Sequence, residues 1–191
     1  MAFLRTRARS LRAALCLALA TLGGAGTSVT AAAAEPSAEF KVKAVFLFNF
    51  AQFVEWPSRV FKSPGAPLVI GVLGDDPFGS YLDALVKGER IGAHPVVVRR
   101  FRAGQDFSDC HVLFVAPSEA GKIGQIAARL QGAHVLTLGD GEAFCRLGGM
   151  VGFVMERGKV RLRINLKAAT AADLTISSKL LTPATIVSGD K

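Results

Sequence analysis

Residues 68–78 read LVIGVLGDDPF. The first six residues are uncharged and have the length of a strand, and a glycine, two aspartates and a proline follow them. A strand that is apolar at every position is typical of a sheet covered on both faces. Asp76 before Pro77 suits the start of a helix, because proline is favoured at the first helical position. We therefore expect a buried strand over 68–73 and a helix over 78–87.

The same alternation of strand and helix continues along the chain. Residues 39–56 (EFKVKAVFLFNFAQFVEW) place apolar side chains at steps of three and four, which predicts a helix that Pro57 ends. The further expected elements are strands at 95–101, 111–116 and 135–138 and a helix at 119–130. This order predicts a single α/β domain with a largely parallel sheet and helices on both faces.

The C-terminal part has a different pattern. Two strand-like runs, 150–155 and 159–166, are separated by Glu156-Arg157-Gly158, which predicts an antiparallel hairpin. A last helical stretch is expected over 168–181, with a break around 174–177.

The first 34 residues predict a cleavable signal peptide, and the domain then spans 35–191. Four arginines precede a short apolar run, and three alanines stand before Glu35 as a cleavage site. The apolar run is shorter than the roughly 20 residues that cross a bilayer, so we expect an exported protein that acts outside the cytoplasm, without direct membrane insertion. Without the leader, 19 basic residues face 15 acidic ones, a net charge of +4 in place of +8. That modest excess is no argument for nucleic-acid binding.

The residues give little support to catalysis. His94, His111 and His134 each stand alone near the expected start of a strand, without a second ligand at metal spacing. No glycine-rich phosphate loop is present, and the serines at 118, 177 and 178 lack the context of a nucleophile elbow. We expect no enzyme activity, no metal and no cofactor.

Three turns should meet at the carboxyl edge of the sheet, where open α/β folds bind ligands: 74–76, 116–119 and 139–142. A ligand crevice there is one interpretation, and a hydrolase would need a nucleophile and a base to converge on it. The favoured interpretation is that Asp76, Ser118 and Asp140 cap the helices that follow.

The first helix is unusually aromatic. It carries five phenylalanines and Trp56, which one sheet face does not normally need. Either part of this surface is buried against a second subunit, or all of it belongs to an ordinary core. The sequence leaves both open.

Several motifs in order form a distinctive set that covers nearly the whole mature chain. They are Lys43-Ala44, Phe48-Asn49-Phe50, Trp56-Pro57, the run 70–79, and the segments 110–114, 136–140, 148–150, 160–166 and 174–181. Together they resemble the YfiR-like family. The resemblance implies a noncatalytic periplasmic regulator that binds and represses the sensor region of an inner-membrane diguanylate cyclase, and so modulates cyclic di-GMP signalling. The alternative is a periplasmic small-molecule binding protein with a different output.

The resemblance also implies a homodimer and a small aromatic or nucleotide ligand. By position it places a candidate ligand pocket at Trp56, Arg59, Ser178 and Lys179. Relatives under redox control have more cysteines than the two of this mature chain, Cys110 and Cys145, which are the candidate redox residues. Cys110 should begin a strand and Cys145 should follow the next strand beyond its opposite end, so pairing across a strand of about 20 Å is not assured.

Overall fold

The structure is a computed structural model, and it describes residues 35–188. The expected signal peptide, residues 1–34, lies outside the described residues. Within 35–188 no helix is long and apolar enough to span a membrane.

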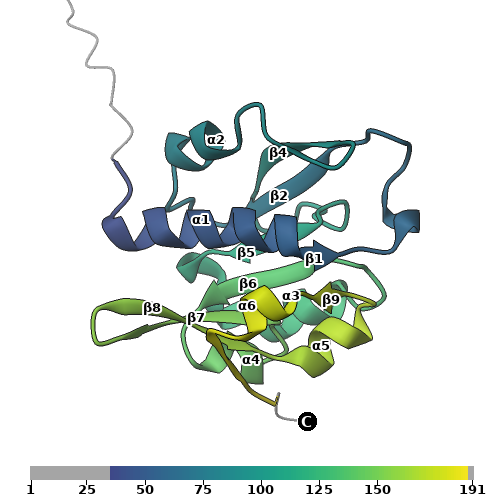
Figure 1. The fold of residues 1–191 in the computed structure, drawn as a ribbon. Helices are drawn as coiled ribbons and strands as arrows, with labels where there is room; N and C mark the ends of the chain where they lie inside the picture. The colour runs from purple at the N-terminus through teal and green to yellow at the C-terminus, as the bar shows by residue number, and fades with distance from the viewer. Residues whose placement is uncertain (1–34, 189–191) are drawn as a thin grey trace, which may run out of the picture. The chain divides into compact units, whose positions relative to one another are not determined.

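An eight-stranded sheet organises the described domain, in the order β10-β8-β7-β6-β5-β2-β4-β3 (Figure 1). Strands β2, β4, β5, β6 and β7 run parallel, β7 and β8 form the antiparallel hairpin, and β10 adds parallel to β8. The predicted fold class is confirmed. The strands are β2 (Leu68–Leu73), β3 (Arg90–Ile91), β4 (His94–Phe101), β5 (Val112–Val115), β6 (Leu136–Asp140), β7 (Val151–Glu156), β8 (Lys159–Ile164) and β10 (Ala184–Ile186).

Strand β2 lies between β4 and β5, and all six of its residues are buried. Both faces need cover because its side chains point alternately to each. Gly71 lets a neighbouring thiol approach, since a Cβ at that position would lie 2.6 Å from the Sγ of Cys110. The run at 68–73 is apolar without interruption because both faces of β2 are buried.

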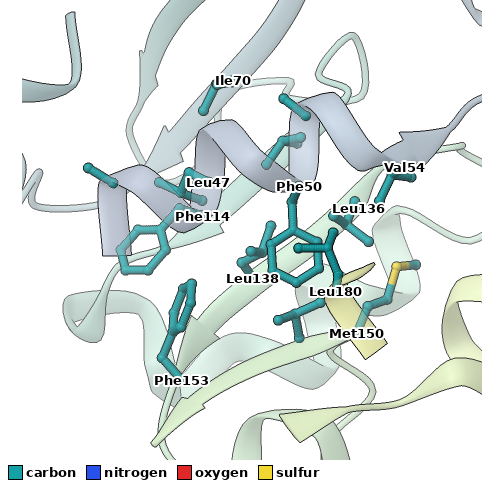
Figure 2. Close-up of a cluster of buried hydrophobic side chains, with 14 of the residues drawn as sticks. Leu47, Phe50, Val54, Ile70, Phe114, Leu136, Leu138, Met150, Phe153 and Leu180 are labelled. Carbon is teal, nitrogen blue, oxygen red and sulfur yellow. The ribbon is translucent and has the colours of Figure 1, made fainter. Parts of the chain in front are cut away.

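Two layers of helices cover the sheet. One face packs against α1 (Ala38–Phe53), α2 (Ser80–Val86), α5 (Leu166–Ala171) and α6 (Ser178–Leu181). The other face packs against α3 (Ile123–Arg129) and α4 (Ala143–Arg146). Figure 2 shows the first core, where Leu47 and Phe50 of α1 point down onto side chains of the sheet.

Helix α1 is capped by Ser37, whose hydroxyl accepts from the Phe40 N–H at 3.4 Å, and it ends earlier than predicted. Val54 and Glu55 form β1, which pairs antiparallel with β9 (Thr175–Ile176), and this pairing takes them out of the helix. The predicted break at 174–177 is where β9 lies, between α5 and α6.

The aromatic surface of α1 is mostly core. Phe50 is fully buried, and the other four phenylalanines of the helix are partly buried against the same cluster. Of the large apolar side chains of α1, only Val42 and Val45 are exposed, at 45% and 40%. The surplus of aromatic residues therefore does not by itself require a second subunit.

The second half of the sheet departs from prediction in detail. Residues Pro117–Lys122 form a 3-10 helix, η2, so the expected helix at 119–130 becomes η2 followed by the shorter α3. Another 3-10 turn, η1 (Ser58–Val60), follows Pro57. The short elements α4, β3 and β10 were not predicted, because two- to four-residue elements depend on the partners that they pack against.

Candidate functional site

The pairing of β1 with β9 brings together the two segments that carry the candidate pocket. The Ser177 N–H donates to the Phe53 carbonyl oxygen at 3.0 Å, which fixes the start of α6 beside the end of α1. The Lys179 ammonium lies 5.0 Å from the centre of the Phe53 ring. Trp56 and Arg59 lie on the first segment, and Ser178 and Lys179 lie on the second. The antiparallel register carries the two pairs away from each other, so that Arg59 contacts Asp173 at one end while Lys179 contacts Phe53 at the other.

Arg59 is already engaged in this region. Its Nη2 lies 2.5 Å from the Asp173 carboxylate, and both side chains are well exposed. The Trp56 indole is held more deeply, with its Nε1 atom buried and without a hydrogen-bond partner among the described residues. A ligand that used the Arg59 guanidinium would have to compete with Asp173.

The three histidines converge at the amino edge of the sheet. His94 opens β4, His111 directly precedes β5, and His134 stands shortly before β6. The starts of parallel strands share one edge, and a cavity of about 300 Å³ lies there, lined by both His111 and His134. Sequence reasoning treated each histidine as isolated, but each one precedes a strand of the same parallel sheet, which is the signal that could have grouped them.

These histidines are held by hydrogen bonds to the backbone. The Nδ1 atoms of His94 and His134 lie 2.7 and 2.8 Å from the carbonyl oxygens of Ala66 and Ala172, so Nδ1 donates in both. His111 is the opposite case, because its Nδ1 accepts from the Val69 N–H at 3.2 Å. Burial, with a smaller contribution from His94, lowers the pKa of His111 to about 4, so its ring is neutral near pH 7.

No metal site forms from these side chains. Within residues 35–188 no group of three or more histidine, cysteine or acidic side chains is placed to hold a metal ion. His94 and His111 are instead separated by the ring of Phe61, which stacks on both.

The two candidate redox cysteines are separate, buried thiols, with no disulfide between them. Cys110 lies beside the amino-edge cavity, whereas Cys145 lies in α4, with its Sγ 3.3 Å from the Arg163 carbonyl oxygen. Burial raises the pKa of Cys110 to about 12 and that of Cys145 to about 11. Both are therefore poor nucleophiles near pH 7.

At the carboxyl edge, the three expected helix caps, Asp76, Ser118 and Asp140, are not the N-caps of the helices that follow them. Asp76 accepts from the Phe78 N–H at 2.7 Å and holds Arg100 with its second oxygen, while Gly79 is the N-cap of α2. The Ser118 hydroxyl accepts from the Asp75 N–H at 2.9 Å. The capping interpretation was wrong here, because these side chains bind neighbouring turns and strands instead of the helices that follow them.

Between the ends of β2 and β5, where a ligand crevice was the alternative interpretation, the two turns are in direct contact. A Cβ on Gly74 would lie 2.5 Å from the Ser118 Oγ, so the two turns touch where an open α/β fold would admit a ligand. A wider polar hollow remains beside it, between the turn after β2 and residues 100–105. Arg100 in its wall is bound to Asp83 and to Asp76, and these two carboxylates raise its pKa.

Asp140, the third expected cap, pairs with a residue that the sequence reading missed. Lys43 lies on the inner face of α1, only 2% exposed, with its Nζ 2.7 Å from the Asp140 carboxylate and a further bond to Glu39. Its ammonium also lies 4.6 Å from the centre of the Phe40 ring. Burial raises the pKa of Asp140, and Lys43 opposes that rise. The ion pair joins α1 to the end of β6.

A family model described as YfiR/HmsC-like matches residues 40–185. The chain belongs to the YfiR/HmsC-like family. The match covers α1 except its first two residues, the whole sheet except the last residue of β10, and both edges described above. Membership supports a general role as a periplasmic regulator of diguanylate cyclase signalling.

Two further comparisons add little to the YfiR/HmsC-like assignment. No curated protein matches the chain. Among solved structures, the ABC domain in complex with L-Trp from Streptococcus pneumonia is similar at 14% identity, with a TM-score of 0.45. That similarity covers 63% of this chain and 55% of the other, so the chain spans about half of that structure's length.

Proposed function

We propose that residues 35–191 form a noncatalytic periplasmic domain that binds the sensor region of an inner-membrane diguanylate cyclase and holds it inactive. The observation that carries this proposal is the family match, which runs through nearly the whole described domain. A ligand or a change of state at the protein would then alter its affinity for the cyclase and release the enzyme.

The geometry of the carboxyl edge agrees with binding as the function. A hydrolase would need a nucleophile and a base within hydrogen-bond reach of each other. Ser118 instead accepts a bond from the Asp75 backbone, and Asp140 is paired with Lys43. Among the described residues, this edge offers no activated nucleophile.

The binding test uses the mature chain and the periplasmic region of the membrane cyclase that its own organism encodes. Light scattering after size-exclusion chromatography measures whether the two form a complex and whether the protein alone is the homodimer that we propose. A stable complex is the expected result. Two separate peaks at micromolar concentrations of both partners would count against the proposed function.

A small-molecule binding protein with another output is the second candidate. The cavity at the amino edge favours it, because cavities of this size accept small ligands. The aromatic or nucleotide ligand proposed for the Trp56, Arg59, Ser178 and Lys179 region belongs to either function. Calorimetry with aromatic amino acids and nucleotides, repeated on Arg59→Gln, tests that region directly.

A further inference from the structure

The amino-edge cavity has a mainly apolar wall with one deeply buried polar ring. Its volume is about 300 Å³, and its apolar lining includes Val60, Phe61, Pro67 and Val69. His111 is 6% exposed and lines the same cavity. None of the four residues of the candidate pocket lines it. The cavity is therefore a second place to look for a ligand.

The imidazole of His111 has a donor without an acceptor. Its Nδ1 already accepts from the Val69 N–H, so in the neutral ring the proton is on Nε2. That Nε2 is buried and has no hydrogen-bond partner among the described residues. Buried donors are almost always satisfied, and leaving one unpaired is costly. A ligand with a hydrogen-bond acceptor would supply the missing partner.

The Phe61 ring lies beside that donor, between the imidazoles of His94 and His111. Its ring lies between two imidazoles, 3.6 Å from the centre of His94 at an interplanar angle of 17° and 4.7 Å from that of His111 at 24°. The two imidazoles thus form a slot for one flat ring. Phe61 follows η1 in a stretch without helix or strand before β2, so its backbone is not part of the sheet.

The charges at the rim favour an anionic ligand. Lys62 and Asp109 pair with each other at 2.9 Å, which cancels their charges. Arg99 also lines the cavity, and no carboxylate of residues 35–188 lies within ion-pair distance of it. The available charge at this cavity is therefore the Arg99 guanidinium, which is suited to a carboxylate.

From the slot, the unpaired donor and the free guanidinium, we propose that this cavity binds a small planar carboxylate whose ring takes the place of Phe61 between His94 and His111. Phe61 fills the slot when the ligand is absent. The ligand's carboxylate extends from the slot into the cavity, toward the Nε2–H of His111 and the Arg99 guanidinium. The proposal concerns a different cavity from the cyclase-binding function and does not depend on it.

The test measures binding of benzoate and 2-naphthoate to the mature chain by calorimetry, at ligand concentrations up to about 5 mM, the range expected for ligands with few atoms. Phe61→Ala empties the slot, so we expect it to bind at least about tenfold more tightly than the natural protein. Cyclohexanecarboxylate, which has the charge without the flat ring, should bind at least about tenfold more weakly than benzoate.

His111→Asn supplies the discriminating variant. Its side-chain oxygen can still accept from the Val69 N–H, while the Nε2 donor is removed. Introduced into Phe61→Ala, it should weaken benzoate binding about tenfold, whereas Lys159→Gln, an exposed position of β8 that does not line the cavity, should leave it unchanged. Absence of binding by Phe61→Ala, or equal binding with and without His111→Asn, would overturn the proposal.

A spectroscopic measurement covers the case in which His111→Asn does not fold. In Phe61→Ala, the Nε2–H nuclear magnetic resonance signal of His111 should shift on addition of benzoate. An unshifted signal at saturating benzoate would also overturn the proposal. In either case, complex formation with the cyclase sensor region is measured separately, so failure of this site leaves that result unaffected.

Discussion

The buried ion pair between Lys43 and Asp140 gives the sharpest prediction about stability. Lys43→Met keeps most of the side-chain volume and removes the charge, leaving a carboxylate without its partner. Breaking a buried pair in this way costs about 3–5 kcal/mol. The Lys43 side chain is 3% exposed but that of Asp140 is 23% exposed, so we expect the lower end, a loss of about 3 kcal/mol in the free energy of unfolding.

For a domain of this size, such a loss lowers the Tm by about 6–12 °C. Urea unfolding followed by circular dichroism measures the free energy directly. The matched control is Lys41→Met on the same helix, whose salt bridge to Glu35 is exposed and should be worth less than about 1 kcal/mol. The Glu39 side chain, at 36% exposed, is closer to solvent than that of Asp140, at 23%, so most of the loss should come from Asp140. Adding Asp140→Asn to Lys43→Met should therefore recover most of it.

The loss should depend on pH with a defined sign. The pKa of Asp140 is raised in the folded protein, so the folded state binds this proton more tightly than the unfolded state does. Lys43→Met removes the charge that opposes the rise, so the folded pKa of Asp140 increases further. The variant's deficit should therefore be smaller at about pH 4.5 than at about pH 7. A loss below about 1 kcal/mol, or an equal loss at both pH values, would refute this reasoning.

Three further predictions concern the buried histidine, the thiols and the packing around α4. The pKa of His111 is lowered to about 4 in the folded protein, so below about pH 6.5 the unfolded protein binds a proton that the folded protein does not. The free energy of unfolding should therefore fall by up to about 3 kcal/mol as the pH falls from about 6.5 to about 4. Urea titrations measure this loss, and His111→Asn should lose much less over the same range. Cys110 and Cys145 should react slowly with a thiol reagent in the native state and give two thiols per chain after unfolding without reductant, whereas fewer than two would contradict the structure. Gly149→Ala should lower the free energy of unfolding by about 2 kcal/mol or more, because the added Cβ would lie 2.1 Å from the Phe144 ring. In the double variant, Phe144→Leu should relieve part of that loss. Losses that simply add would argue against the contact.

The sequence predicted the parts of the fold that are set by local pattern. The run at 68–73 is apolar at each position because β2 is covered on both faces, and the alternation at 159–166 reflects a strand with one polar face. The predicted bounds failed where tertiary pairing overrides local preference. Val54 and Glu55 continue a helical pattern, yet they pair with β9 instead.

The candidate site was less predictable because its parts come from separate strand starts. His111 has no nearby partner in the sequence, and its neighbours Phe61 and His94 reach it only through the parallel order of β2, β4 and β5. The burial of Lys43 could have been predicted, since a lysine in the middle of an apolar stripe must find a partner when the helix is buried. Its partner Asp140 lies 97 positions away, and no local pattern reveals it.

The most direct test of the proposed regulator measures synthesis of cyclic di-GMP by the full-length membrane cyclase in proteoliposomes, with the protein added on the side of the sensor region. The expected result is a saturable fall in the rate of synthesis, with a midpoint that matches the affinity of the complex. Cyclase truncated to its cytoplasmic part should be unaffected and serves as the control. An unchanged rate at saturating protein, with the complex shown to form, would contradict repression as the function.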